Sequence, residues 1–280
     1  MSKSFILAWA LPRAATLALE ISAILYWRGW LRIRRTRPAM FPAWRLICFL
    51  SGIAAIIIAI ASPLDTISDQ LLVAHMAQHY ILMSVAPPLI VLSAPVVPLL
   101  RGLPRWFVRP ALGPLIRTVW LRRLFKLLVT PRVAWILMNA AYIGWHIPAA
   151  YEFALASWQW HIVEHACFFL TSILFWWPVI EPWPSRFSGS RWLLLPYLLS
   201  ADIINTAISA LLCFSGRVLY PTYANQSRIF AITPLADQAA AGALMWVLGS
   251  IVFLIPAMYI TLKLLSPRNR SFAMRNLPGH

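Results

Sequence analysis

The stretch "WRLICFLSGIAAIIIAIAS", residues 44–62, contains a single charged side chain, Arg45. A helix needs about 20 predominantly apolar residues to cross the hydrocarbon layer of a membrane. A soluble surface helix alternates its apolar stripe with polar positions, and this stretch does not. It therefore predicts a transmembrane helix.

The rest of the chain has the same character. Hydrophobic residues make up 61% of the 280 positions and charged residues 11%, whereas soluble domains contain roughly half apolar and about a quarter charged residues. We predict an all-α fold, a polytopic membrane helical bundle of about seven transmembrane helices that forms one domain over residues 1–280. The predicted spans cover residues 5–27, 44–62, 73–100, 133–150, 161–181, 191–213 and 236–265.

Positive charge gives the bundle a predicted orientation. Twenty of the 24 Lys and Arg residues lie in three connecting segments and the C-terminal tail, while the connections 63–72 and 149–160 hold none. Because cytoplasmic loops are enriched in Lys and Arg, we expect the N-terminus outside and the C-terminus in the cytoplasm. This distribution favours membrane topology and lipid contact over nucleic-acid binding.

The longest basic segment, residues 101–132, contains seven Arg, one Lys and no acidic residue. Its stretch "PLIRTVWLRRLFKLLV", residues 114–129, mixes Trp, Leu and Phe with the basic side chains. A helix lying in the inner headgroup layer has this composition. A solvated basic loop that only sets the topology is the other interpretation, and both stay open.

Five of the six histidines fall at one predicted depth, the outer ends of three spans. Two open the third span, one closes the fourth and two open the fifth: His75, His79, His146, His161 and His165. Residues four apart share one face of a helix, so each of the two pairs can bind a single ion. One interfacial His is more often a headgroup contact than a ligand. Five on three helices indicate a polar functional cluster, because ionisable groups within a membrane are costly and mark function.

The two pairs lie in similar strings, "HMAQH" at 75–79 and "HIVEH" at 161–165, which place Gln78 and Glu164 at the same offset. In a metal site these two side chains would orient the imidazoles by hydrogen bonds, as would Gln238 in "LADQ". Imidazole binds zinc, copper, iron and nickel. A haem would need one His from each pair, since two on one helix cannot take opposite faces of the ring, and this spacing counts against it.

Two further side chains are additional candidate ligands. Met83 lies one turn beyond His79 on the same face, although packing is the more common role of such a Met. Asp237 begins the seventh span at the level of the histidines, where it can be a ligand or a helix N-cap. Asp202, near the middle of the sixth span, can serve a relay or a structural hydrogen bond between helices.

The strings "HMAQHYILMSVAPPLIVLSAP", "GWHIPAAYEFALASWQWHIVEHACFFLTSILFWWPV" and "PLADQAAAGALMW" resemble the polytopic cytochrome c oxidase assembly factor CtaG family. The resemblance covers residues 44–265. The positions that match the family's motifs are His75, Gln78, His79, His146, His161, Glu164, His165, Asp237 and Gln238. One departure is Glu152, where the family is expected to favour Asp, and it keeps the carboxylate.

The resemblance implies a multi-pass protein of the bacterial plasma (inner) membrane that supports the biogenesis of a haem-copper oxidase. It implies an assembly factor or chaperone without catalytic residues that supplies copper to the oxidase. Copper is therefore the expected ion, with zinc as the alternative. Cytochrome c oxidase subunits are the expected partners, and a copper chaperone and a homodimer stay open.

Two other functions remain as alternatives. An intramembrane zinc metallopeptidase would use His161 and His165 as ligands and Glu164 as general base, but the third ligand is not evident and Gln78 cannot act as a base in the similar string. A copper transporter would use the spans, the mid-membrane Asp202 and a third span interrupted at Pro87 and Pro88 as a pathway.

Overall fold

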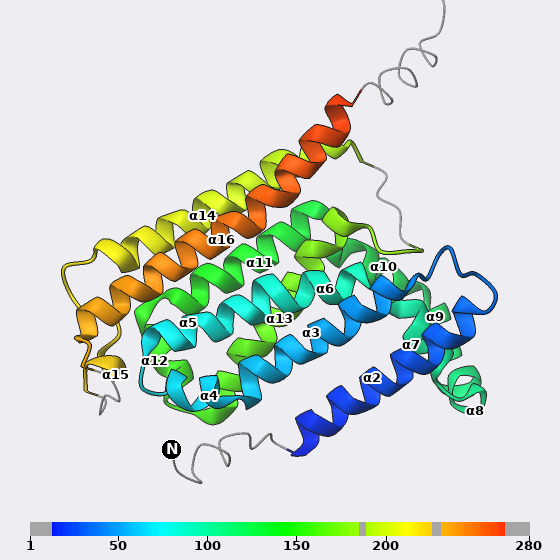
Figure 1. Cartoon of the computed structure of the whole chain (residues 1–280), viewed down its shortest axis with the longest axis horizontal. Coiled ribbons are helices and arrows are strands. Elements are labelled where there is room, and N and C mark those ends of the chain that lie inside the picture. Colours follow the sequence, from blue (N-terminus) through cyan, green and yellow to red (C-terminus); the bar gives the residue numbers. More distant parts are fainter. Residues whose placement is uncertain (1–12, 185–188, 226–230, 267–280) are drawn as a thin grey trace, which may run out of the picture.

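The protein is an all-helical bundle, shown by a computed structural model that describes residues 13–184, 189–225 and 231–266 (Figure 1). No strand occurs in these ranges, and long helices run side by side along the bundle. This confirms the predicted all-α fold class.

Four helices are long and apolar enough to cross a membrane: α3 (Ala43–Ala61), α13 (Trp158–Ile180), α14 (Leu194–Phe214) with its preceding 3-10 turn η3 (Arg191–Leu193), and α16 (Pro234–Leu265). Two bent pairs also qualify, Leu72–Leu92 with Val96–Gly102 at 69° and Val119–Leu128 with Pro131–His146 at 66°. The described residues therefore provide four to six candidate spans, and they fit a multi-pass membrane protein.

The predicted first span, 5–27, corresponds in part to α2 (Arg13–Arg34), and its residues 5–12 lie outside the described ranges. Helix α2 is not among the candidate spans. It continues past Trp27 through Arg28, Arg32 and Arg34, so its last part is charged. It packs on α7 (Val96–Gly102), where a Cβ atom on Gly29 would overlap the Pro98 carbonyl.

The third predicted span, 73–100, is one apolar run in sequence and three helical pieces followed by a break in the structure. It comprises α5 (Leu72–Tyr80), a π-helical turn η1 (Ile81–Val85) and α6 (Ala86–Leu92), and α7 follows after a turn at Ala94 with φ of 52°. Pro87 has no N–H to give to the Met83 carbonyl four residues earlier. Trp176 Nε1 of α13 donates to that carbonyl at 3.3 Å, so the side chain of a neighbouring helix stabilises the irregular turn.

The two ends of the bundle differ in composition. At one end lie α4 (Pro63–Ser68), α12 (Pro148–Leu155) and α15 (Pro221–Ala224) (Figure 1). We call it the histidine end, because α5 and α13 both begin there and carry their histidines in their first eight residues. The opposite, basic end holds α7, α8 (Arg105–Phe107), η2 (Val108–Leu112), α9 (Gly113–Arg117) and α10 (Val119–Leu128). The stretch 114–129 is thus largely helical, and α10 has no buried residue.

Helices α11 (Pro131–His146), α14 and α16 are joined by polar contacts inside the bundle. Asn205 of α14 accepts from Tyr142 Oη at 2.9 Å and donates to the Met245 carbonyl at 3.3 Å. Ser250 donates to Asp202 Oδ1 at 2.8 Å, so Asp202 makes a hydrogen bond between helices. Gly242 lets α16 approach α14, because a Cβ atom there would lie 2.6 Å from Cys213 N. These contacts hold α16 where it can anchor α5.

Candidate metal centre

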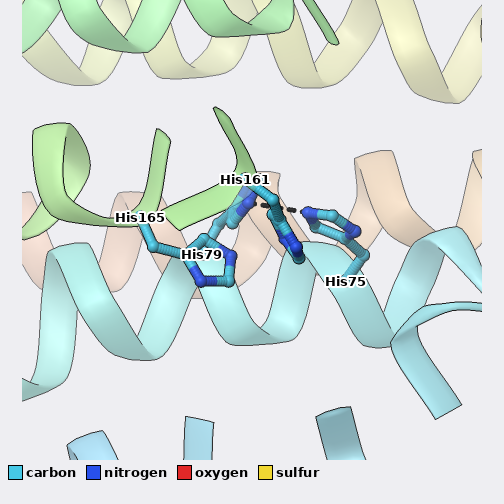
Figure 2. A group of neighbouring side chains, drawn as sticks. All are labelled: His75, His79, His161 and His165. Carbon is cyan, nitrogen blue, oxygen red and sulfur yellow. Dashed lines mark hydrogen bonds between the residues drawn. The ribbon is translucent and has the colours of Figure 1, made fainter. Parts of the chain in front are cut away.

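Four histidines from two helices converge at the histidine end. His75 and His79 of α5 and His161 and His165 of α13 each offer one ring nitrogen, and these atoms all lie within 4.8 Å of one another (Figure 2). Ring centroids are 5.0 Å apart for His75 and His161 and 5.2 Å apart for His79 and His165. We call this group the four-histidine cluster. Its α5 members are almost fully buried, at 1% and 3% exposure.

The first turn of α5 is fixed by a side chain from a distant part of the sequence. Asp237 at the start of α16 accepts from Leu72 N at 2.9 Å through Oδ2 and from Val73 N at 3.0 Å through Oδ1. Leu71 at the N-cap position cannot cap the helix with its own side chain, so a carboxylate satisfies two of the free N–H groups and complements the helix dipole. The start of α16 is capped separately by Thr233 Oγ1, which accepts from Ala236 N at 3.2 Å. Asp237 thus positions the helix that carries His75.

Gln78 ties the same helix to α3 and α4. Its Nε2 donates to the Ala59 carbonyl at 2.6 Å and to Asp65 Oδ1 at 2.9 Å. The side chain therefore faces away from the four-histidine cluster toward the α3–α4 corner and fixes the rotation of α5.

A tyrosine sets the tautomer of His75. Tyr223 Oη donates to the Ser68 carbonyl at 3.0 Å, and it lies 2.7 Å from His75 Nδ1. Because the hydroxyl has one hydrogen, it accepts from Nδ1–H, and the lone pair of His75 is left on Nε2. That Nε2 lies 2.8 Å from His79 Nε2, a distance that suits one N–H···N hydrogen bond or two lone pairs that share a cation.

The α13 pair is held by ordinary helix geometry. His161 N donates to the Ser157 carbonyl at 3.0 Å in the first turn of α13, and His165 follows one turn later on the same face. The Nε2 atoms of both rings are buried and have no hydrogen-bond partner among the described residues. Two donor atoms are therefore available for an ion.

Glu164 lies beside the cluster and makes no hydrogen bond through its side chain to any described residue. Its side chain is fully buried, its Oε1 lies 3.7 Å from His79 Nε2, and both oxygens lack a hydrogen bond among the described residues. A buried carboxylate is costly unless a cation or a hydrogen-bond donor compensates it. The arrangement places it where an ion bound by the histidines would do so.

Three other side chains from the sequence prediction lie outside the four-histidine cluster, although the ring centroid of His146 is 6.3 Å from that of His79. His146 is outside the group of four, its Nδ1 is 2.7 Å from the Tyr142 carbonyl, and with Met83 it lines a cavity deeper in the bundle. Gln238 accepts from Leu219 N at 2.7 Å and donates to the Arg217 carbonyl at 3.1 Å, so it holds the loop before α15.

Sequence reasoning missed the tyrosines around the cluster. Tyr223, Tyr220 and Tyr151 are buried at 0 to 2% exposure, and Tyr220 Oη donates to the His146 carbonyl at 2.9 Å. Burial raises the pKa of the Tyr223 phenol, so this group stays a neutral hydroxyl. Their place in outer connections of the predicted topology, at the level of the histidines, was the available signal.

The donor set fits a borderline or soft metal ion. Four imidazole nitrogens suit copper or zinc, and hard cations such as Mg²⁺ and Ca²⁺ prefer oxygen. Such an ion would bind the Nε2 atoms that have no hydrogen-bond partner among the described residues, and its charge would compensate that of the Glu164 carboxylate.

Comparison with known families identifies one family for most of the chain. The model of the family described as cytochrome c oxidase caa3 assembly factor matches residues 24–266. No solved structure matches the chain.

The curated relatives are uncharacterized mycobacterial proteins. The chain is 28% identical to one from Mycobacterium bovis over 249 aligned residues, and the aligned region is 85% of this chain and 36% of the relative. It is 26% identical over 254 residues to one from Mycobacterium leprae, which covers 86% and 37%. The chain therefore spans about a third of the length of the curated relatives it matches.

Proposed function

We propose that this chain, which belongs to the cytochrome c oxidase caa3 assembly factor family, holds a copper ion in the four-histidine cluster and supports its delivery to the oxidase. The ion is cargo that the protein binds and releases. Subunits of a haem-copper cytochrome c oxidase are the proposed partners, and the proposed location is the bacterial plasma membrane with the histidine end outside.

One observation supports the proposal: four imidazoles from two helices offer nitrogen atoms within 4.8 Å of one another, beside a buried carboxylate whose one ion-pair contact among the described residues is with His79. A cluster that served only packing would have no reason to collect donor atoms without partners, since buried polar groups are ordinarily satisfied.

Charge balance favours the cuprous ion. The four histidines bind metal as neutral imidazoles, and Glu164 contributes one negative charge. A monovalent ion adds one positive charge to the buried group, whereas Cu²⁺ or Zn²⁺ would add two, and each further buried charge is costly in surroundings of low dielectric. The proposed cargo is therefore Cu⁺.

Metal analysis of the purified chain tests the proposal. After loading with Cu⁺ under reducing conditions and removal of excess ion, wild type should retain copper, and a variant with both His161→Ala and His165→Ala should lose it from the cluster. Gln159→Ala, an exposed change on the same helix, is the matched control. Wild type without copper, or full nitrogen coordination in the double variant, would refute the copper site.

A cellular assay tests the role in assembly. In a strain that lacks its own copy of this gene, wild type should restore the copper-containing oxidase, while the double His variant should leave it without activity at normal membrane abundance. If the double His variant also restored oxidase activity, the four-histidine cluster would not be required for the assembly function.

The peptidase alternative fits the arrangement less well. A catalytic zinc site has three protein ligands and an open position for water, whereas here a fourth imidazole takes that position. Glu164→Gln separates the two functions, because a peptidase would lose its turnover and a copper holder would keep its ion.

A further inference from the structure

We infer that the protein has a second site for a soft monovalent metal ion, a methionine-lined cavity between α5, α11, α14 and α16, next to the four-histidine cluster. Six of its lining residues offer nitrogen or sulfur: His79, His146, Met76, Met83, Met138 and Met245. The role of this site in copper transfer rests on the proposed function, but its existence does not.

His146 supplies the first argument. Its Nδ1 lies 2.7 Å from the Tyr142 carbonyl, and a carbonyl can only accept, so Nδ1 carries the hydrogen and Nε2 carries the lone pair. That Nε2 is buried and has no partner among the described residues, and the residue is 7% exposed. A ring fixed by a backbone carbonyl with its other nitrogen available is the usual state of a metal-ligating histidine.

The methionines supply the second. Four of the eight in the chain line this one cavity, each at most 8% exposed. Methionine as a gap-filler would close the space between helices, yet a cavity of about 40 Å³ remains open. Thioether sulfur selects cuprous copper over zinc, calcium and magnesium.

His79 connects the two sites. Its Nε2 lies 2.8 Å from His75 Nε2 in the four-histidine cluster, its ring lines the cavity, and its Nδ1 is buried without a partner among the described residues. An ion can therefore pass from the cluster to the cavity around a single imidazole. No step needs a change of oxidation state.

The sulfur atoms are staggered along the bundle. Met83 follows His79 by four residues, which is about 6 Å along a helix, and Met138 precedes His146 by eight, which is about 12 Å. With this spread, an ion would contact the sulfur atoms one after another along the cavity, whereas a cage would need all four around one position. The cavity then leads from the histidine end toward the middle of the bundle.

Copper stoichiometry and X-ray absorption of the full chain loaded with Cu⁺ test this inference. Wild type should bind two ions. At low loading the copper should show nitrogen scattering alone, and at full loading it should show both nitrogen and sulfur scattering. Replacing Met76, Met83, Met138 and Met245 by Leu should remove one ion and all sulfur scattering, because Leu keeps the volume and removes the ligand. The matched control changes Met40 and Met258 to Leu, the remaining described methionines, and should keep both ions.

Two further measurements keep the test decisive. His146→Ala leaves every sulfur in place and should also lose the second ion, so it covers the case in which the fourfold variant does not fold. The His161→Ala and His165→Ala variant should lose the nitrogen-bound ion and retain sulfur scattering. If wild type at full loading held copper by nitrogen alone, the second site would be overturned and the proposed function would stand. If copper were bound by sulfur and not by the histidines of the cluster, the second site would stand and the proposed function would be overturned.

Discussion

Asp237→Ala tests whether this carboxylate is a helix cap or a metal ligand. The side chain is fully buried and satisfies two N–H groups of α5, those of Leu72 and Val73. Each buried N–H left without an acceptor costs about 1 to 3 kcal/mol. Water that enters the vacated volume can satisfy one of them, so we expect a loss of about 1 to 3 kcal/mol in the free energy of unfolding.

Asp237→Asn provides the comparison that separates the two roles. Asn keeps one acceptor oxygen in a side chain of nearly the same shape. If Asp237 is a cap, the Asn variant should lose about half as much stability as the Ala variant, and the cluster should still bind copper at saturation. Asp202→Asn removes a carboxylate that accepts one hydrogen bond from Ser250, and it should cost about 1 kcal/mol.

The assay combines unfolding by SDS in mixed micelles, followed by circular dichroism, with copper per chain measured on the same samples. The cap predicts that stability falls in the order wild type, Asn, Ala. If Asp237→Ala changed stability by less than about 0.5 kcal/mol while Asn and Ala both abolished copper binding, the cap assignment would be wrong and Asp237 would be a ligand.

Tyr223→Phe removes the hydroxyl that holds His75 Nδ1, and we expect copper affinity to fall about 10- to 100-fold at unchanged stoichiometry; Tyr151→Phe, whose hydroxyl is 3.4 Å from that of Tyr223, should have a smaller effect, and equal losses in a competition titration would contradict the assigned tautomer. Glu164→Gln should keep the ion at saturation but weaken Cu⁺ affinity by a similar factor, and unchanged affinity would remove the charge-balance argument. Gly242→Ala should destabilise the bundle by about 1 to 3 kcal/mol, because the added Cβ would meet the α14 backbone. Gly144→Ala in α11 is the control, because nothing lies within 4 Å of a Cβ added there. Equal stability of the two variants would refute the close approach of α16 to α14.

The pairing of the histidines within each helix follows from local rules that a sequence contains. Residues four apart share a helix face, so each pair forms whatever the rest of the fold does. The predicted depth then brings the α5 and α13 pairs to the same end of the bundle. Their meeting across two helices depends on packing, which no local pattern contains.

His146 shows where this reasoning stops. Apolar periodicity gives the depth of a residue in the bundle but not the direction in which its ring points. Here that direction depends on the Tyr142 carbonyl and on a cavity lined by three other helices. Depth alone therefore grouped His146 with the other four.

The broken third span has a similar cause. Residues 73–100 are apolar throughout, so composition predicts one helix, and the turn at Ala94 depends on a positive φ that apolar content does not encode. The prolines at 87 and 88 did indicate irregularity, which appears before them as the π-helical turn η1. The side chain that supports this turn, Trp176, is too distant in sequence to be paired with it by pattern.

Unsatisfied polar atoms give the proposed copper ion a means of stabilising the protein. Six of the ten buried side-chain nitrogen and oxygen atoms without a partner among the described residues belong to the two proposed sites, in His79, His146, His161, Glu164 and His165. Each such atom costs about 1 to 3 kcal/mol, and a cation compensates several of them at once. Binding at 100 times Kd adds about 2.7 kcal/mol to stability by linkage. Under the proposed function, the cost of these unsatisfied atoms therefore strengthens the hold of the site on the ion.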